Sequence, residues 1–179
     1  MRSWMVRWPG LSLVVLSLSV LSFMACEPPS AKAPLTPDAS TFVVFSQDDL
    51  WGYKDLSGSV VIPATYTIAE AFLKDGGAFV VDDKGWGFIN YKGEMMVRPF
   101  LFDNGPDPFS EGLARFVQDE KMGYYAPSGK IMISPIYDFV EPFKEGRARV
   151  CTGCIKVMDG EHYSFEGGTW STVEIPATH

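Results

Sequence analysis

Cys151 and Cys154 form a Cys-x-x-Cys pair, the spacing in this chain with the clearest chemical meaning. In an exported protein such a pair favours a disulfide. Zinc is an alternative, because thiolate and imidazole suit this metal and His162 follows, with Asp159 or Glu161 as candidates for a fourth ligand. A redox role would need a thioredoxin-like βαβ setting, which the sequence lacks. Inert thiols remain a further alternative.

Pairs of acidic residues precede two Trp-Gly motifs and a similar Met-Gly motif, and they suggest calcium as another ligand, because carboxylates suit that ion. The pairs are Asp48-Asp49, Asp82-Asp83 and Asp119-Glu120. None of them belongs to a loop with alternating oxygen ligands and a distal glutamate. Solvated turn residues are therefore the favoured interpretation, and we predict no resident metal and no cofactor.

Signatures of enzymes are missing from the sequence. It contains no G-x-S-x-G, P-loop, H-E-x-x-H or G-x-G-x-x-G motif. His162 and His179 are the only histidines, which argues against a histidine-based acid–base site. We predict that the protein is not an enzyme. A pair of carboxylates, as in a carbohydrate-active enzyme, is the alternative that sequence leaves open.

The third cysteine, Cys26, ends a segment with the features of a secretory signal. Arg2 and Arg7 supply positive charge, Leu11 to Met24 is apolar apart from serines, and Ala25 immediately precedes the cysteine. The predicted signal peptide is residues 1–25. Ser-Phe-Met-Ala-Cys resembles a bacterial lipobox, although leucine is more usual at the phenylalanine position. The resemblance implies lipidation of Cys26; signal cleavage without lipidation is the alternative.

Residues 26–40 are rich in proline and small residues and are predicted to be a flexible tether. Removing residues 1–25 takes away two cations and changes the formal net charge from −7 to −9. An acidic chain has no electrostatic footprint for nucleic acid, so we expect membrane attachment through the lipid alone. The expected location is the periplasm, outer membrane or cell surface; Glu27 after the cysteine resembles outer-membrane sorting.

The elements that would position these residues repeat along residues 41–179, which we predict to be one domain. Anchor pairs are Trp51-Gly52, Trp86-Gly87 and Met122-Gly123, with the glycines 35 and 36 residues apart. Turn glycines at 58, 93 and 129 keep the same intervals, and prolines at 63, 99 and 135 are spaced by 36. Aromatics follow each proline, and Phe-x-x-Gly appears at Phe109 and Phe143.

These marks resemble the WG (KWG) repeat family, with Met122 departing from tryptophan. The resemblance implies a β-rich tandem array and carries no known catalytic residues. Alternating residues around Trp51 and Trp86 independently predict strands. We predict all-β repeats of about 35 residues, each with three strands. The repeats would form a solenoid-like or partly closed array, or alternatively a propeller.

Three details of each repeat are predicted. The prolines should end the return strands that begin at Val60, Met95 and Ile131. The glycine beside each tryptophan should admit a bulky group, such as a ring from the neighbouring copy. Little helix is expected, with residues 68–72 the best candidate for a short helical turn. Recurrence of the aromatic residues favours core packing over a ligand platform.

A fourth copy is degenerate. From Val117 to Met122 is 5 residues, whereas from Cys151 to Trp170 is 19, and Ser171 stands where glycine is expected. We predict an insertion at about residues 151–168. The array suggests a non-enzymatic, membrane-anchored scaffold that binds a protein or a cell-envelope component. A purely structural surface protein without a specific ligand is the alternative.

Overall fold

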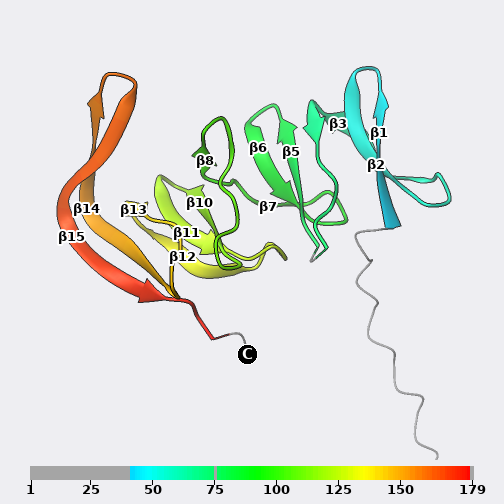
Figure 1. Ribbon diagram of the computed structural model, residues 1–179. Coiled ribbons are helices and arrows are strands. Elements are labelled where there is room, and N and C mark those ends of the chain that lie inside the picture. Colours follow the sequence, from blue (N-terminus) through cyan, green and yellow to red (C-terminus); the bar gives the residue numbers. More distant parts are fainter. Residues whose placement is uncertain (1–40, 75, 178–179) are drawn as a thin grey trace, which may run out of the picture. The chain divides into compact units, whose positions relative to one another are not determined.

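The computed structural model describes residues 41–74 and 76–177. The predicted signal peptide, Cys26 and the tether therefore lie outside the described residues. The regular elements of the described part are all β-strands (Figure 1).

Five small antiparallel sheets contain these strands. The first sheet has β1 (Phe42–Gln47), β2 (Leu50–Asp55) and β3 (Val60–Tyr66). The second has β4 (Ile68–Ala69), β5 (Ala78–Asp82), β6 (Gly85–Ile89) and β7 (Met95–Val97), and β8 (Leu101–Phe102) pairs with β9 (Gly105–Pro106). The fourth has β10 (Ala114–Gln118), β11 (Lys121–Tyr125) and β12 (Ile131–Tyr137). The last has β13 (Phe139–Val140), β14 (Arg147–Asp159) and β15 (His162–Glu174).

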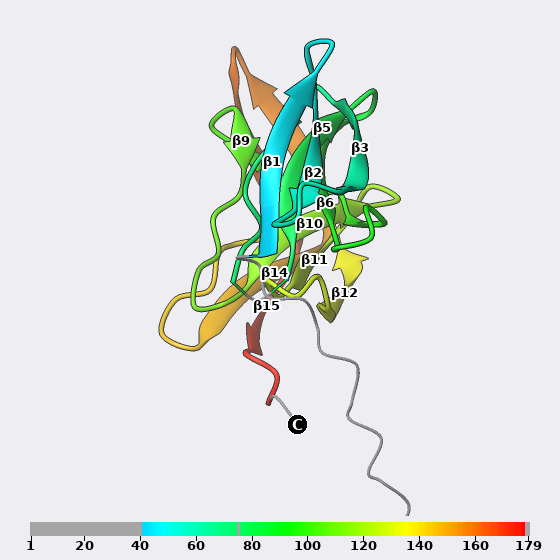
Figure 2. The same ribbon diagram turned by 90° about the vertical axis from the view of Figure 1, so that its right-hand side faces the viewer.

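Each predicted repeat forms a three-stranded meander, so the expected all-β tandem architecture is confirmed. The turn glycines Gly58, Gly93 and Gly129 have φ of 88°, 79° and 79°, the left-handed conformation that joins the anchor strand to the return strand. The sheets follow one another in chain order (Figure 1), and no sheet of the described residues closes into a barrel. Figure 2 views the array from the β1 end.

The prediction that proline ends each return strand is wrong for Pro63 and Pro135, which lie inside β3 and β12. Trp51 pairs with Tyr66 and Tyr53 with Ile62, so the return strand bulges opposite Gly52. Proline is tolerated there because a residue in a bulge makes no ladder hydrogen bond. The N–H that proline lacks is therefore not needed at this position.

The bulge also corrects the explanation of the motif glycine. A Cβ on Gly52 would lie 2.5 Å from the carbonyl oxygen of Ile62 and 2.7 Å from the amide nitrogen of Ala64. A Cβ on Gly123 would lie 2.8 Å from the nitrogen of Pro135. At Gly52 and Gly123, glycine is therefore needed to admit the backbone of the same repeat's return strand, and not a ring from the next copy.

No helical turn forms at residues 68–72. Ile68–Ala69 is instead strand β4, which pairs with β5 of the next sheet. Phe139–Val140 is β13 and pairs with β14 in the same way. The segment after each of these return strands thus adds an edge strand to the following repeat. Because the backbone hydrogen bonds go to the neighbouring sheet, an isolated helical turn has no advantage.

The core is built from the aromatic residue at the third position of each motif. Tyr53, Phe88 and Tyr124 are completely buried, whereas Trp51 is 39% exposed. The expected core packing therefore applies to the third-position rings and not to Trp51. Phe143, from a Phe-x-x-Gly segment, and Phe72, from the looser copy Phe72-Leu-Lys-Asp-Gly76, pack on Tyr124 and Tyr53 with ring centroids 4.7 Å apart.

Neighbouring repeats are also joined through their turns. The carboxylate of Glu111 accepts hydrogen bonds from the backbone amides of Glu145 and Gly146, at 2.7 and 2.9 Å. Both Glu111 and Glu145 have a left-handed backbone, with φ of 51° and 54°. Each is followed by glycine, so the two Phe-x-x-Gly segments form equivalent tight turns, one of which caps the other.

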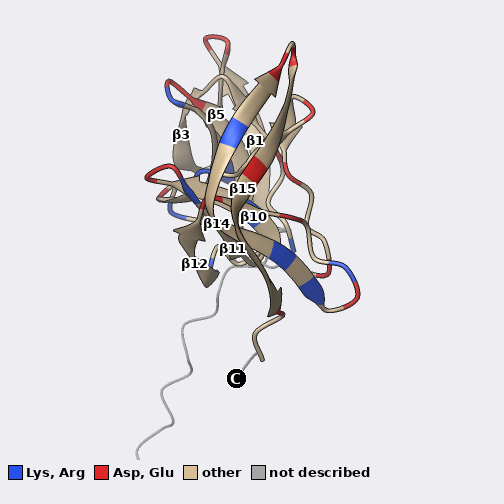
Figure 3. Ribbon diagram, turned by 90° about the vertical axis from the view of Figure 1, so that its left-hand side faces the viewer, with Lys and Arg blue, Asp and Glu red and all other residues tan. Residues whose placement is uncertain are grey.

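Acidic residues gather at turns of the array (Figure 3). Asp48-Asp49 and Asp119-Glu120 are two-residue hairpin turns in which all four residues have positive φ. Such turns require a left-handed backbone, which aspartate tolerates better than most residues. The described residues contain no group of three or more His, Cys, Asp or Glu side chains arranged to hold a metal ion.

Candidate binding site

The fourth repeat keeps the register of the others but extends its hairpin. Phe116 pairs with Gly123 and Val117 with Met122 in the third repeat. Val150 pairs with Ser171 and Cys151 with Trp170 in the fourth. The additional residues therefore lie in one long hairpin formed by β14 and β15, each of 13 residues.

A bend divides this hairpin into a base and a tip. Gly153, Gly167 and Gly168 all have positive φ, between 64° and 78°. A Cβ on Gly168 would lie 2.5 Å from the amide nitrogen of Cys154, so the two backbones approach closely at the bend. The positive φ of all three glycines and the close approach at Gly168 thus permit a change of direction that residues with side chains would adopt only with strain.

A disulfide joins Cys151 to Cys154 across the bend. Successive odd and even positions of a flat strand face opposite sides, so residues i and i+3 meet only where the strand is bent. Both cysteines are buried. The pairing occurs at the point where β14 turns towards the tip, and it holds that turn covalently.

Asp138 fastens the same bend to the third repeat. Its carboxylate accepts hydrogen bonds from the Lys121 ammonium on β11 and from the backbone amide of Gly153. The hydrogen bond from Lys121, with a further contribution from Gly153, lowers the pKa of Asp138 below its ordinary value. The direction of the tip is therefore set by one covalent bond and one charged contact.

The structure does not bring together the residues considered for zinc. His162 pairs with Asp159 at the far end of the hairpin, whereas Cys151 pairs with Trp170 near its base. The two sulfur atoms bond to each other. Asp159 and Glu161 also lie at the tip. The position of His162 instead makes it part of a cleft.

The opposite wall of this cleft comes from the second repeat. After Pro99 the chain forms the small hairpin β8–β9, whose turn residues Asp103 and Asn104 have φ of 49° and 70°. Asp and Asn are the residues that best accept this conformation, followed here by Gly105. Leu101 and Phe102 on β8 are 49% and 59% exposed. The hairpin therefore presents apolar side chains to solvent.

A buried ion pair lies beside the base of this small hairpin. The Nε of Arg115 donates to the Asp107 carboxylate at 2.8 Å, and a second guanidinium nitrogen donates to the other oxygen. Arg115 also donates to the carbonyl of Val140 at 3.2 Å, and its guanidinium lies 4.5 Å from the ring centre of Phe100. Both charges are compensated, as burial requires.

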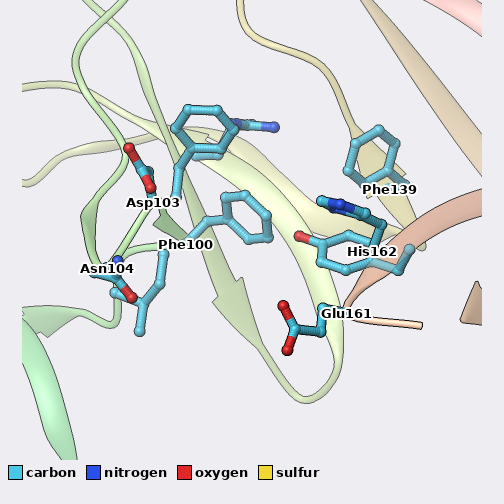
Figure 4. A pocket seen from close by; sticks show the side chains of 10 residues that line it. Phe100, Asp103, Asn104, Phe139, Glu161 and His162 are labelled. Carbon is cyan, nitrogen blue, oxygen red and sulfur yellow. The ribbon is translucent and has the colours of Figure 1, made fainter. Parts of the chain in front are cut away.

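These elements enclose a cavity of about 610 Å³. Figure 4 shows Asp103 and Asn104 on one side, Glu161 and His162 on the other, and Phe100 between them. The remaining lining residues are Leu101, Phe102, Arg115, Phe139 and Tyr163. The volume is in the range of sites that hold small ligands or peptide side chains.

A second cavity of about 510 Å³ adjoins the first, because Phe139 and Tyr163 line both. It continues along the hairpin to Phe165 and Trp170. Phe139 stacks on Phe165 with ring centroids 4.2 Å apart and an interplanar angle of 16°. Together the two cavities make a track with aromatic walls.

Sequence reasoning identified only part of this site. It singled out the break in the repeat, which supplies Glu161, His162 and Tyr163, but not the β8–β9 hairpin. The sequence Asp103-Asn104-Gly105 is a strong two-residue turn signal and could have revealed the hairpin. Neither the ion pair between Arg115 and Asp107 nor the position of Phe139 in the cavity wall can be predicted from the spacing of residues in the sequence.

Comparison with protein families explains the repeated geometry. Three consecutive stretches, residues 51–85, 86–121 and 122–153, match the model described as the WG containing repeat, and together they cover more than half of the chain. The chain belongs to the WG-repeat family. Each matched stretch begins at the first residue of an anchor pair, including Met122, where the tryptophan is absent.

The tip of the β14–β15 hairpin lies beyond the third WG-repeat match, which ends at residue 153. No curated protein and no solved structure matches this chain. None of the described residues belongs to a helix that could cross a lipid bilayer.

Proposed function

We propose that this WG-repeat protein is an exported lipoprotein that binds a protein or another component of the cell envelope and has no catalytic activity of its own. The signal-like residues 1–25, Cys26 and the proline-rich tether support export and anchoring. The tandem array supports binding, because repeat scaffolds offer extended surfaces held by neighbour contacts.

One observation carries the choice of site. The chain departs from regular repeat structure in the β8–β9 hairpin and in the tip of β14–β15, and both departures line the same cavity. Leu101, Phe102 and Tyr163 on these walls are between 42% and 59% exposed. Large exposed side chains gathered around a concave surface are typical of binding sites.

The alternative function, a structural surface protein without a specific ligand, makes a different prediction for the same surface. We propose to place a photo-crosslinking residue at Phe102 or Tyr163 of the full chain, expressed in a bacterial envelope. Val43 on β1 is a matched control position, because it is 51% exposed but lies outside the cleft. The binding proposal predicts one defined cross-linked species from Phe102 and Tyr163 and none from Val43.

No defined species at either cleft position, or the same products at all three positions, would overturn the binding proposal in favour of the structural role. The anchor is tested separately by radiolabelled palmitate. Wild type should incorporate the label and Cys26→Ser should not. An unlabelled wild type would contradict lipidation without affecting the cross-linking result.

A further inference from the structure

We propose that the cleft accepts an organic cation, namely the lysine or arginine side chain of an extended segment of a partner protein. The inference rests on the proposed function, since it names the chemistry that this binding site would recognise. It is carried by two cavity-lining carboxylates, Asp103 and Glu161, that take part in none of the ion pairs of the described residues, by the exposed ring of Phe102, and by a track that is longer than one side chain.

The charged side chains that line the larger cavity are Asp103, Arg115 and Glu161, and His162 lies beside them. Arg115 is neutralised by Asp107 through a bidentate, buried ion pair. Asp103 and Glu161 lie on opposite sides of the cavity that they line (Figure 4). Because Arg115 is paired with Asp107, the carboxylates of Asp103 and Glu161 are left as two negative charges of the lining, which a cation would balance.

Aromatic faces attract cations through the negative charge of the ring centre. The region already shows this preference internally, since the ammonium of Lys156 lies 4.0 Å from the ring centre of Tyr163. In the adjoining cavity the guanidinium of Arg149 lies 4.4 Å from the ring centre of Trp170. Phe102, at 59% exposure, offers a further ring to an incoming group.

The shape favours an amphipathic cation on a polypeptide over a compact free ion. Lysine and arginine carry an apolar stem behind a charged head. The exposed apolar surface of Leu101 and Phe102 suits the stem, and the carboxylates of Asp103 and Glu161 suit the head. The second cavity shares Phe139 and Tyr163 with the first, so residues adjacent to the cation have a continuous surface to follow.

The test measures binding of two fluorescein-labelled Gly-Ser peptides to the full chain purified in detergent. One peptide contains three lysines, and the other contains three acetyl-lysines of nearly the same shape without charge. The cleft variant is Asp103→Asn with Glu161→Gln. The control variant is Asp119→Asn with Glu120→Gln, which removes the same two types of charge from a hairpin turn that does not line the cavity.

We expect the lysine peptide to bind wild type and the control variant alike, and to bind the cleft variant about tenfold more weakly, equivalent to about 1.4 kcal/mol. The acetylated peptide should bind wild type as weakly as the lysine peptide binds the cleft variant. Equal loss in both variants would mean general attraction to an acidic protein and would overturn the inference. Equal binding of both peptides, or none of either, would overturn it too.

Failure of this inference is distinguishable from failure of the proposed function. If the cleft positions give a defined cross-linked species while the lysine peptide shows no preference for the intact carboxylates, the site binds a partner by other chemistry. If neither experiment gives a signal, the binding function itself is contradicted.

Discussion

In the first and third repeats, equivalent buried tyrosines make the same hydrogen bond to a backbone carbonyl, whereas the fourth repeat is stabilised by other contacts. The hydroxyl of Tyr53 donates to the carbonyl of Glu70 at 2.7 Å, and that of Tyr124 donates to the carbonyl of Glu141 at the same distance. Burial raises the pKa of both tyrosines, so the hydroxyls stay protonated and able to donate.

The long hairpin of the fourth repeat has no such central tyrosine. Most residues of β15 are exposed. The buried residues of β14 all lie between Ala148 and Cys154. A disulfide and the Asp138 contacts hold the bend. Positions in the regular repeats are constrained by neighbouring backbone, while the tip has few neighbours. A chain can vary such a tip without disturbing the array, which makes it a suitable place for recognition.

The second repeat is intermediate between these two regions. Its motif glycine, Gly87, faces the side chains of Met95 and Arg98 instead of a bulged backbone. Arg98 donates to both oxygens of Asp82 and to the carbonyls of Gly85 and Trp86. Flexible side chains thus occupy the space that the return strand occupies in the first and third repeats.

The largest expected effect comes from adding one methyl group to a motif glycine. Gly52→Ala and Gly123→Ala should each lower the free energy of unfolding by roughly 2–4 kcal/mol, because the new Cβ meets backbone that cannot move away. Gly87→Ala should cost only about 1 kcal/mol, since side chains can shift. Denaturant unfolding of the purified variants measures the difference.

Gly105→Ala is the control for this series. Gly105 has no heavy atom within 4 Å of an added Cβ, and its φ is not positive. The stability of the Gly105→Ala variant should therefore stay near that of wild type. Equal losses of unfolding free energy on replacing Gly52, Gly87 and Gly105 by alanine would show that the bulged return strand is not what requires glycine at position 52.

Removal of the disulfide should affect the fourth repeat alone. Replacing Cys151 and Cys154 together by serine should cost about 2 kcal/mol, because the cross-link closes a very short loop. Amide hydrogen exchange should become faster between residues 152 and 169 and stay unchanged around Tyr53. Intact-mass measurement with and without reductant reports on the pairing itself. Faster exchange throughout the array would contradict the separation between hairpin and repeats.

A smaller effect is expected from the buried tyrosine hydroxyls. Tyr53→Phe and Tyr124→Phe should each cost about 1 kcal/mol, since each leaves a backbone carbonyl without its donor. The two losses should be similar, because the two sites have the same geometry. Tyr163→Phe, at an exposed ring, should leave thermal unfolding unchanged. A large difference between the first two variants would break the equivalence of the first and third repeats.

The smallest effect is a pH dependence at the junction of array and hairpin. Asp138 has a lowered pKa in the folded protein, so its contribution to stability is present above the ordinary carboxyl pKa of about 4 and is lost as the pH falls through the lowered value. Asp138→Asn should therefore cost less than about 1 kcal/mol at neutral pH, as half-exposed Lys121 is its partner.

That cost should diminish in unfolding experiments carried out at progressively lower pH below about 4. The paired variant Lys121→Met should show the same trend, because the two groups form one contact. A cost of Asp138→Asn that stays constant with pH would mean that the charge of Asp138 is not responsible.

Local residue chemistry made much of the array predictable. Alternating residues around Trp86 and the glycines at 58, 93 and 129 indicate hairpins, because strand period and left-handed turns depend on adjacent residues. The proline rule failed at Pro63 and Pro135 for the opposite reason. Whether a proline ends a strand or lies in a bulge depends on the partner strand, here on the space above Gly52 and Gly123.

The sequence by itself determined the repeat, its period, the strand order within each copy and the position of the break after Cys151. These follow from spacing and from local conformational preferences. Only the tertiary structure decided that the third-position ring is the buried one, that Arg115 pairs with Asp107, and that the β8–β9 turn faces Glu161 and His162 across one cavity. Such contacts depend on the bend of a hairpin and on the packing of one sheet against the next, and neither is encoded in the interval between residues.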